Sequence, residues 1–210
     1  MKNHLQNKIS NQHLFFGVIP RAQLNAKELH DFEDTKQKYD SLLKLCDACT
    51  AKDRKAKLLH NLAFEHSRRK KFKEASDIYK KAMKLISTDN SQYLTTLESY
   101  LSACHKGKLL PEEELISLAK EGMNLCKKRN DKRLVYFQLQ LYLLNNQESH
   151  YYQYIETTAL EHFRNSGYNI LVDHYEKKLF QYYIKQNETT KALKLAESLL
   201  EGKRSFYDYE

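Results

Sequence analysis

The cysteines are the residues whose type and spacing first suggest chemistry. Cys46 and Cys49 form a C-x-x-C pair, a spacing found in zinc sites and in redox centres. A structural zinc site needs four ligands, and Cys104 and Cys126 do not form a second pair of that kind. Cys46 and Cys49 also continue an apolar helical face, so we interpret both as small buried side chains. We expect no metal and no cofactor.

Other catalytic arrangements are also missing from the sequence. It contains no nucleophile elbow, no phosphate-binding loop and no paired-histidine metal motif. The 9 histidines are scattered, and His66 is interpreted as structural. Acidic residues are abundant, but no two of them stand out as an acid–base pair. We therefore expect a protein that binds and is not an enzyme.

The charge of the chain is basic but dispersed. The formal net charge is +8 and the pI is about 9.1, which suits contact with nucleic acid, anionic membranes or acidic partners. The densest basic run, Arg68 to Lys73, falls between two helical patterns and is interpreted as a solvated turn. DNA contact, indirect or through a missing domain, remains an alternative.

The ends of the chain and its hydropathy bear on location. Residues 1–10 are polar and lack the apolar centre of a signal peptide. No run of about 18 apolar residues could span a bilayer. We expect a cytoplasmic protein without a membrane partner. Residues 1–24 are an N-terminal arm of uncertain structure, and residues 25–210 form the folded domain.

The spacing of apolar residues predicts helices throughout that domain. Only 5 Gly and 2 Pro occur in 210 residues, which disfavours sheets and their tight turns. A helix is predicted from Asn25, with Glu28 at capping-box spacing, to about Cys49. Amphipathic pairs then follow, with these apolar faces: 58–66 and 75–86; 93–104 and 115–126; 134–144 and 152–163; 171–183 and 192–199. The fold class is all-α, with about four antiparallel helix pairs after an N-terminal helix.

The second helix of each pair carries a small residue at a corresponding position. These are Ala75, Ala119, Ala159 and Ala192, at intervals of 44, 40 and 33 residues. Tetratricopeptide repeats have a period of about 34 residues, and a small residue there lets two helices approach closely. The intervals indicate a helical repeat whose middle units are longer.

One stretch carries the repeat signature most clearly. Residues 59–66, with Leu59, Leu62, Ala63 and His66, match the spacing of the tetratricopeptide W-x-x-L-G-x-x-Y motif, and Phe72, Ala75, Tyr79 and Ala82 continue it. The last pair fits the pattern too, whereas the middle pairs fit only in their second helices. The chain thus resembles a tetratricopeptide-repeat domain over about three quarters of its length. This resemblance implies a right-handed superhelix of antiparallel helix pairs.

A finer resemblance lies in residues 118–128, in His60-Asn61-Leu62-Ala63 and in Leu199-Leu200-Glu201. These segments look like helices of bacterial peptide-pheromone receptors of the PlcR, NprR and Rap group. Members of that group bind a short signalling peptide in the concave groove of a tetratricopeptide superhelix, and many carry an N-terminal DNA-binding helix-turn-helix. Residues 1–55 show no such compact run of short helices. The resemblance therefore implies the receptor part alone, or a relative with another output.

The first helix of each pair lines the concave side of such a superhelix. Residues of these helices that lie outside the apolar stripe are therefore candidates for contact with a peptide. Asn61 offers a donor and an acceptor to a peptide backbone, and Arg68 could hold a carboxylate. The full candidate set is Lys57, His60, Asn61, Phe64, Arg68, Tyr100, Gln138, Tyr142, Lys177, Lys178 and Gln181. Together they suit a peptide with an acidic group or a free C-terminus.

The sequence thus predicts a non-catalytic, cytoplasmic receptor for a short signalling peptide that regulates transcription or a partner protein. One alternative is a structural adaptor or assembly protein without a small peptide ligand. Another is a DNA-linked regulator that uses the basic surface. The 15 tyrosines are concentrated in the second half of the chain, which suits interfaces and a possible homodimer.

Overall fold

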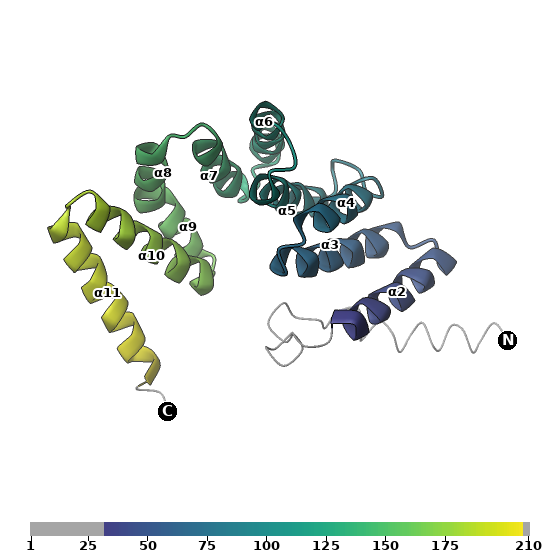
Figure 1. Cartoon of the computed structure of the whole chain (residues 1–210), viewed down its shortest axis with the longest axis horizontal. Coiled ribbons are helices and arrows are strands. Elements are labelled where there is room, and N and C mark those ends of the chain that lie inside the picture. Colours follow the sequence, from purple (N-terminus) through teal and green to yellow (C-terminus); the bar gives the residue numbers. More distant parts are fainter. Residues whose placement is uncertain (1–31, 208–210) are drawn as a thin grey trace. The chain divides into compact units, whose positions relative to one another are not determined.

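The computed structural model describes residues 32–207, and every regular element within them is helical (Figure 1). The chain divides into two compact units, residues 1–58 and residues 59–210. The N-terminal arm of residues 1–24 and the predicted capping pair of Asn25 and Glu28 lie outside the described residues.

The first unit contains α2 (Phe32–Ala48) and the beginning of α3 (Lys52–Arg68). Tyr39 and Cys46 are buried on one face of α2, seven residues apart, as two turns of an amphipathic helix require. The chain turns after this helix at Thr50, which has a positive φ of 53°, and α3 begins two residues later. Cys49 corrects the sequence interpretation: it lies beyond the end of α2 and is exposed, because the helical face stops at Ala48.

The second unit runs from the rest of α3 through successive helices. They are α4 (Phe72–Met83), α5 (Ser91–Gly107), α6 (Glu112–Arg129), α7 (Leu134–Leu144), α8 (Glu148–Tyr154), the π-helical segment η2 (Ile155–Ala159), α9 (Leu160–Asn165), α10 (Asn169–Lys185) and α11 (Thr189–Tyr207). The predicted pairs are confirmed: α3 with α4, α5 with α6, α7 with the α8–η2–α9 run, and α10 with α11. From α4 to α11, consecutive helices of the second unit pack against each other.

The loops between these helices use left-handed residues at the predicted breaks. Asn146, Asn187 and Gly167 have φ values of 54°, 60° and 70°, and they lie two residues after the ends of α7, α10 and α9 respectively. At the end of α5 the left-handed residue is Lys108 (φ 50°), directly after Gly107. At its start, the Asn90 side chain accepts a 2.9 Å hydrogen bond from the Gln92 backbone N–H.

The aligned alanines of the second helices are all buried. Ala75, Ala119 and Ala159 are 0% exposed and Ala192 is 1% exposed. Gly122 of α6 also lies at a close approach, because a Cβ placed on it would come within 2.5 Å of Cζ of the buried Phe137 of α7. Small residues in the second helices therefore let neighbouring helices meet, which confirms the alignment of the repeats.

The second helix of the third pair departs from the sequence prediction of one regular helix. Its middle, η2, is a π-helical turn between α8 and α9. The Thr157 hydroxyl donates a 2.9 Å hydrogen bond to the Gln153 carbonyl oxygen, beside a second β-branched residue, Thr158. Threonine back-bonding of this kind competes with the regular helical ladder. Ile155 and Ala159 at either end of the turn are nevertheless fully buried.

The core of the second unit consists of two hydrophobic clusters that meet along α7. One joins α7 residues Phe137, Leu141 and Leu144 to buried residues of α3 to α6. The other joins α7 residues Val135 and Leu139 to the α8–η2–α9 run, α10 and α11. Because α7 contributes residues to both clusters, only the part of its surface outside these two contacts is open to polar side chains.

Candidate functional site

The candidate site consists of the surfaces of the first helices, α3, α5, α7 and α10, that do not pack against the second helices. In α3, packing against other helices buries some of the predicted contact residues and leaves others exposed. His60 is 3% exposed, its Nδ1 lies 3.2 Å from Oγ1 of Thr96 in α5, and its ring lies 5.4 Å from the Tyr79 ring in α4. His60 is therefore a packing residue, and its prediction as a ligand contact was wrong. α3 is covered by two helices at once, so its buried face is wider than its apolar stripe.

The other candidates of α3 are less buried than His60. Asn61 and Phe64 are half-buried, and Arg68 is exposed. Arg68 donates a 3.3 Å hydrogen bond to Oε1 of Glu65, whose other oxygen accepts a 2.7 Å bond from Arg69. Lys57 is exposed and belongs to the first unit. α3 thus carries a half-buried amide, a half-buried aromatic ring and an exposed guanidinium.

Tyr100 of α5 is the second candidate that the structure removes. It is 3% exposed, and the Lys80 ammonium of α4 lies 5.5 Å from its ring centroid. Burial raises the pKa of the Tyr100 hydroxyl well above its usual range. The aromatic ring fills the contact between α4 and α5, so its prediction as a groove residue was wrong. Sequence spacing could not separate it from the apolar stripe, because tyrosine suits both positions.

The candidates of α7 have different surroundings. Gln138 is half-buried. Tyr142 is also half-buried, and its ring lies 6.1 Å from His150 and 5.6 Å from Tyr154, both in α8. Tyr142 therefore packs on the second helix of its own pair.

Arg133, just before α7, was not predicted and links α7 to α5. It donates a 2.6 Å bond to the Ser91 carbonyl oxygen, a bond to the Thr95 hydroxyl, and bonds of 2.8 and 2.5 Å to the carboxylate of Asp131. These bonds lower the pKa of Asp131 and raise that of Arg133. These hydrogen bonds connect α7 to α5, two successive first helices. No local sequence pattern predicts this network, because its partners are about 40 residues apart in the chain.

The candidates of α10 differ in how far they are exposed to solvent. Lys177 and Gln181 are exposed, and the Lys177 ammonium makes a 2.6 Å ion pair with Asp173. Lys178 is half-buried instead. Its ammonium donates a 3.3 Å hydrogen bond to the Tyr151 hydroxyl of α8. It also lies 5.7 Å from the Tyr151 ring centroid and 6.0 Å from the Tyr175 ring centroid.

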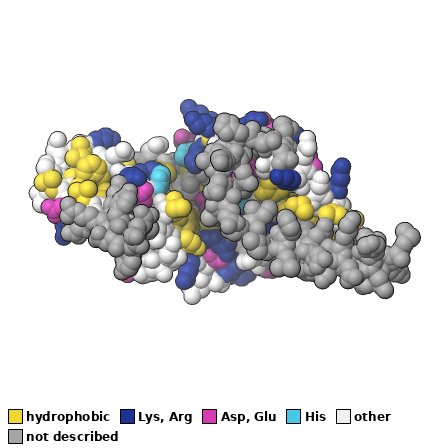
Figure 2. Space-filling model, turned by 90° about the horizontal axis from the view of Figure 1, so that it is seen from below, with side chains coloured by type: hydrophobic (Ala, Val, Ile, Leu, Met, Phe, Trp, Pro, Cys, Tyr) yellow, Lys and Arg dark blue, Asp and Glu magenta, His cyan; other side chains and the backbone are white. Residues whose placement is uncertain are grey.

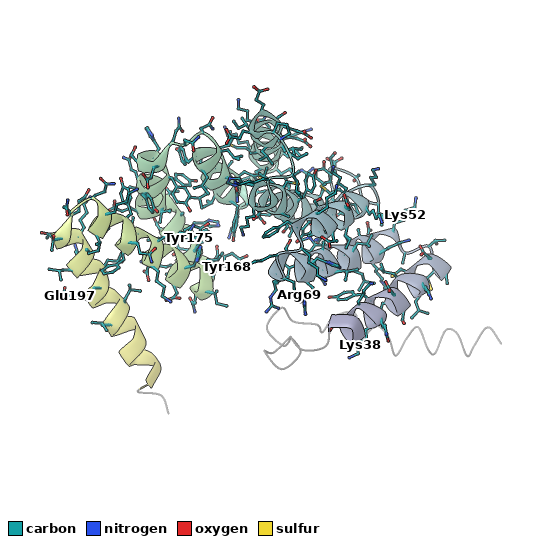
Figure 3. All side chains as sticks on the ribbon, viewed as in Figure 1. Lys38, Lys52, Arg69, Tyr168, Tyr175 and Glu197 are labelled. Carbon is teal, nitrogen blue, oxygen red and sulfur yellow. The ribbon has the colours of Figure 1, made fainter. Side chains whose placement is uncertain are left out.

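Two charged side chains of α5 contribute to the pKa shifts of Lys178 and Tyr175 in α10. Burial lowers the pKa of Lys178, and the positive charge of Lys106 in α5 lowers it further. Burial raises the pKa of Tyr175, and the negative charge of Glu98 in α5 contributes to the same shift. Tyr175, labelled in Figure 3, stacks on Phe163 of α9 with ring centroids 5.2 Å apart. Lys106, Tyr151 and Tyr175 were missed because residues this far apart in sequence become neighbours only in the folded repeat.

The described residues also bear on the cysteine pair, on metal binding and on membrane spans. Burial raises the pKa of the Cys46 thiol, while Cys49 is exposed, and both are free thiols. Within residues 32–207, no group of three histidine, cysteine or acidic side chains is arranged to hold a metal ion. No helix of this part of the chain has the length and apolar character needed to cross a membrane.

Comparison with known proteins identifies the fold. No protein-family model and no curated protein matches the sequence. Among solved structures, the chain is similar to the apo form of the quorum sensor NprR from B. thuringiensis, with a TM-score of 0.61 and 17% sequence identity. The match covers 78% of this chain and 49% of that chain, so this chain spans about half the length of NprR. The chain therefore has a tetratricopeptide-like helical repeat fold, and its structural resemblance to the PlcR and NprR group is confirmed.

Proposed function

We propose that this chain is a non-catalytic, cytoplasmic receptor module that binds a short peptide on the exposed faces of its first helices. The similar fold of a quorum sensor supports a sensing role. Helical repeats of this kind bind extended ligands across successive units, because each unit contributes one helix to a continuous surface. The output is regulation of transcription or of a partner protein.

The face of α3 carries the proposal. Asn61 is half-buried on α3, with Phe64 about one helical turn and Arg68 about two turns further along the same helix. A carboxamide fixed on a helix both donates to and accepts from a peptide backbone, whatever the side chains of that peptide are. An adjacent ring and guanidinium supply an apolar contact and a positive charge. These groups match what an extended peptide offers.

Native mass spectrometry of the purified chain, with a pool of short cell-derived peptides, tests the proposal. We expect a discrete added mass of one peptide, and we expect Asn61→Ala to lose it. Asn124→Ala is the matched control, since Asn124 is exposed on α6, a second helix, and should leave capture unchanged. A folded protein that captures no peptide, or equal capture by both variants, contradicts a peptide site at Asn61.

An adaptor or homodimer is the second candidate, and exposed apolar residues favour it. Ile170 and Ile184 of α10 are 86% and 54% exposed, and Leu193 and Leu200 of α11 are also exposed. Figure 2 shows hydrophobic side chains on the surface at this end of the second unit. Large exposed apolar side chains suit an interface with another protein. Sedimentation of the wild type and of Ile184→Lys tests this: a dimer that the substitution dissociates supports it, and a monomeric wild type contradicts self-association.

The basic run at the end of α3 gives less support to direct DNA contact. Arg68 and Arg69 both bond to Glu65, and Lys73 makes a 3.4 Å ion pair with Asp77. Three of its cations are therefore partly neutralised within the protein. A DNA-binding assay at low salt checks this alternative: affinity that falls steeply with added salt would support it.

A further inference from the structure

The run from α8 through η2 to α9 holds one more residue than a regular helix needs. Its buried side chains follow at steps of four residues, at Tyr151, Ile155, Ala159 and Phe163. In a regular α-helix a step of four residues turns about 40° beyond a full turn, so three such steps displace the last side chain by about 120°. The wide turn of η2 takes up this excess, and all four side chains stay in one hydrophobic cluster.

Hydrogen bonds locate the extra residue. The Leu160 N–H donates to the carbonyl oxygen of Ile155, five residues earlier, which is the bond that defines a π-helix. The Thr157 hydroxyl donates a 2.9 Å bond to the Gln153 carbonyl oxygen, so a side chain supplements the backbone bonds beside the wide turn. Thr157 and Thr158 are exposed. The extra residue therefore lies on the solvent side, where its removal takes away no buried side chain.

Packing of α9, and not the composition of η2, holds this arrangement. The sequence of η2 contains neither Gly nor Pro, which are common causes of an irregular helical turn. Phe163 of α9 is fully buried, and its ring centroid lies 5.4 Å from that of Tyr136 in α7 and 5.2 Å from that of Tyr175 in α10. The π turn is thus stabilised because it keeps Phe163 in contact with two first helices.

α10 contacts this run on both sides of its extra residue. On the C-terminal side, Tyr175 stacks on Phe163. On the N-terminal side, burial raises the pKa of Tyr183, and a hydrogen bond with Glu156 raises that pKa further. The fourth pair, α10 with α11, is therefore docked on a segment whose two ends differ in helical register. A change of register within η2 must break one of these two contacts.

The loop after α9 has room for the extra residue. α9 is only 6 residues long and ends at Asn165. Gly167 follows in a left-handed conformation with a φ of 70°, and a Cβ placed on it would meet nothing within 4 Å. If the Leu160 N–H bonds to the carbonyl oxygen of Glu156, four residues earlier, the turn becomes a regular α turn. The extra residue then moves along α9 toward this loop.

We propose that η2 is a conformational switch that docks and releases the fourth helix pair. In one state, the π turn holds Phe163 against Tyr136 and Tyr175. In the other, α8, η2 and α9 form one regular helix, the extra residue lies in the loop at Gly167, and Phe163 is rotated by about 100° away from Tyr175. Changes of helical register take roughly microseconds to milliseconds, so the switch needs no unfolding of the unit.

Deletion of Thr157 from the full chain tests the geometry. It leaves the buried side chains at steps of four, three and four residues, the spacing of a regular amphipathic helix, so we expect a folded protein whose Tm is at most about 3 °C below that of the wild type. Deletion of Lys120, exposed on the regular helix α6, is the matched control. It rotates Gly122 away from Phe137 and should lower the Tm by at least about 10 °C. Equal losses from the two deletions overturn the proposal, because η2 then holds no extra residue.

Hydrogen exchange read by mass spectrometry tests the switch itself. The Thr157 deletion lacks the residue that must move, so amides of residues 156–165 should exchange at least about tenfold more slowly in it than in the wild type, and those of α6 equally in both. Thr157→Ala keeps the residue and loses only the hydroxyl, so its exchange should be at least as fast as that of the wild type. Equal exchange in the wild type and the folded deletion variant overturns the switch, because the register of η2 then does not change.

Discussion

Nδ1 of His60 lies 3.2 Å from Oγ1 of Thr96, and both side chains are buried between α3 and α5. The Thr96 hydroxyl also donates a 2.9 Å bond to the Gln92 carbonyl oxygen of its own helix. This contact joins the first helices of two successive pairs. The sequence pattern predicted that His60 contacts a peptide ligand, but in the fold its side chain packs between helices.

Removing the Thr96 hydroxyl should destabilise the protein while leaving its shape intact. Thr96→Val is close in volume and leaves a buried imidazole nitrogen without this partner, so we expect a loss of about 1–3 kcal/mol. Urea denaturation followed by circular dichroism measures it. Thr190→Val, at an exposed position of α11, is the control and should change stability by less than about 0.5 kcal/mol. Equal stability of the two variants would show that the contact contributes nothing.

Filling the close approach at Gly122 should also destabilise the fold. Alanine is the better helix former by about 1 kcal/mol, but its Cβ would overlap the ring of the fully buried Phe137. We expect Gly122→Ala to lose about 1–3 kcal/mol in thermal or urea denaturation. In the Phe137→Leu background the same substitution should cost less, because the ring is absent. A stabilised Gly122→Ala single variant would contradict the close approach.

The buried carboxylate of Glu65 should depend on Arg69. The Glu65 residue is 3% exposed and the two side chains meet at 2.7 Å. Arg69→Met leaves that charge with only the longer 3.3 Å bond to Arg68, so a loss on the order of 3 kcal/mol is expected. Lys73→Met breaks an exposed ion pair with Asp77 and should cost no more than about 1 kcal/mol. Denaturation at pH 7 compares them, and similar losses would be inconsistent with a buried pair at Glu65.

Stability should decline in acid partly through Asp131. Hydrogen bonds from Arg133 lower its pKa in the folded state below the ordinary value of 3.8. A carboxyl with a lowered folded pKa contributes stability above its unfolded pKa and loses that contribution as the pH falls through the folded pKa. The unfolding free energy of the wild type should therefore fall below about pH 4 more steeply than that of Asp131→Asn. Parallel curves for the two proteins would exclude a lowered pKa at Asp131.

The thiols should differ in reactivity in the native protein. Cys49 is exposed, whereas Cys46, Cys104 and Cys126 are buried, and burial raises the pKa of Cys126 to about 11. Thiolate is the reactive form, so we expect Cys49 to be alkylated quickly and these three slowly at pH 8. Mass spectrometry of iodoacetamide-treated protein identifies the modified residue, and denaturant should make all 4 cysteines reactive. Rapid labelling of Cys126 in the native protein would contradict its burial.

The sequence by itself determined the helices, their pairing and their small-residue contacts. Apolar spacing and the breaks at Asn146, Gly167 and Asn187 are local properties, since a helix face and a left-handed turn each depend on a few neighbouring residues. The aligned alanines were predictable for the same reason, because close helix approach excludes larger side chains.

Only the tertiary structure decided which polar and aromatic side chains remain accessible. His60 and Tyr100 lie outside or beside the apolar stripe in sequence, yet neighbouring helices cover them. Lys178 looks like an ordinary surface lysine in the sequence, yet in the folded unit burial lowers its pKa and its ammonium lies beside Tyr151 of α8. Burial and electrostatic environment depend on residues distant in the chain, so sequence spacing alone cannot assign them.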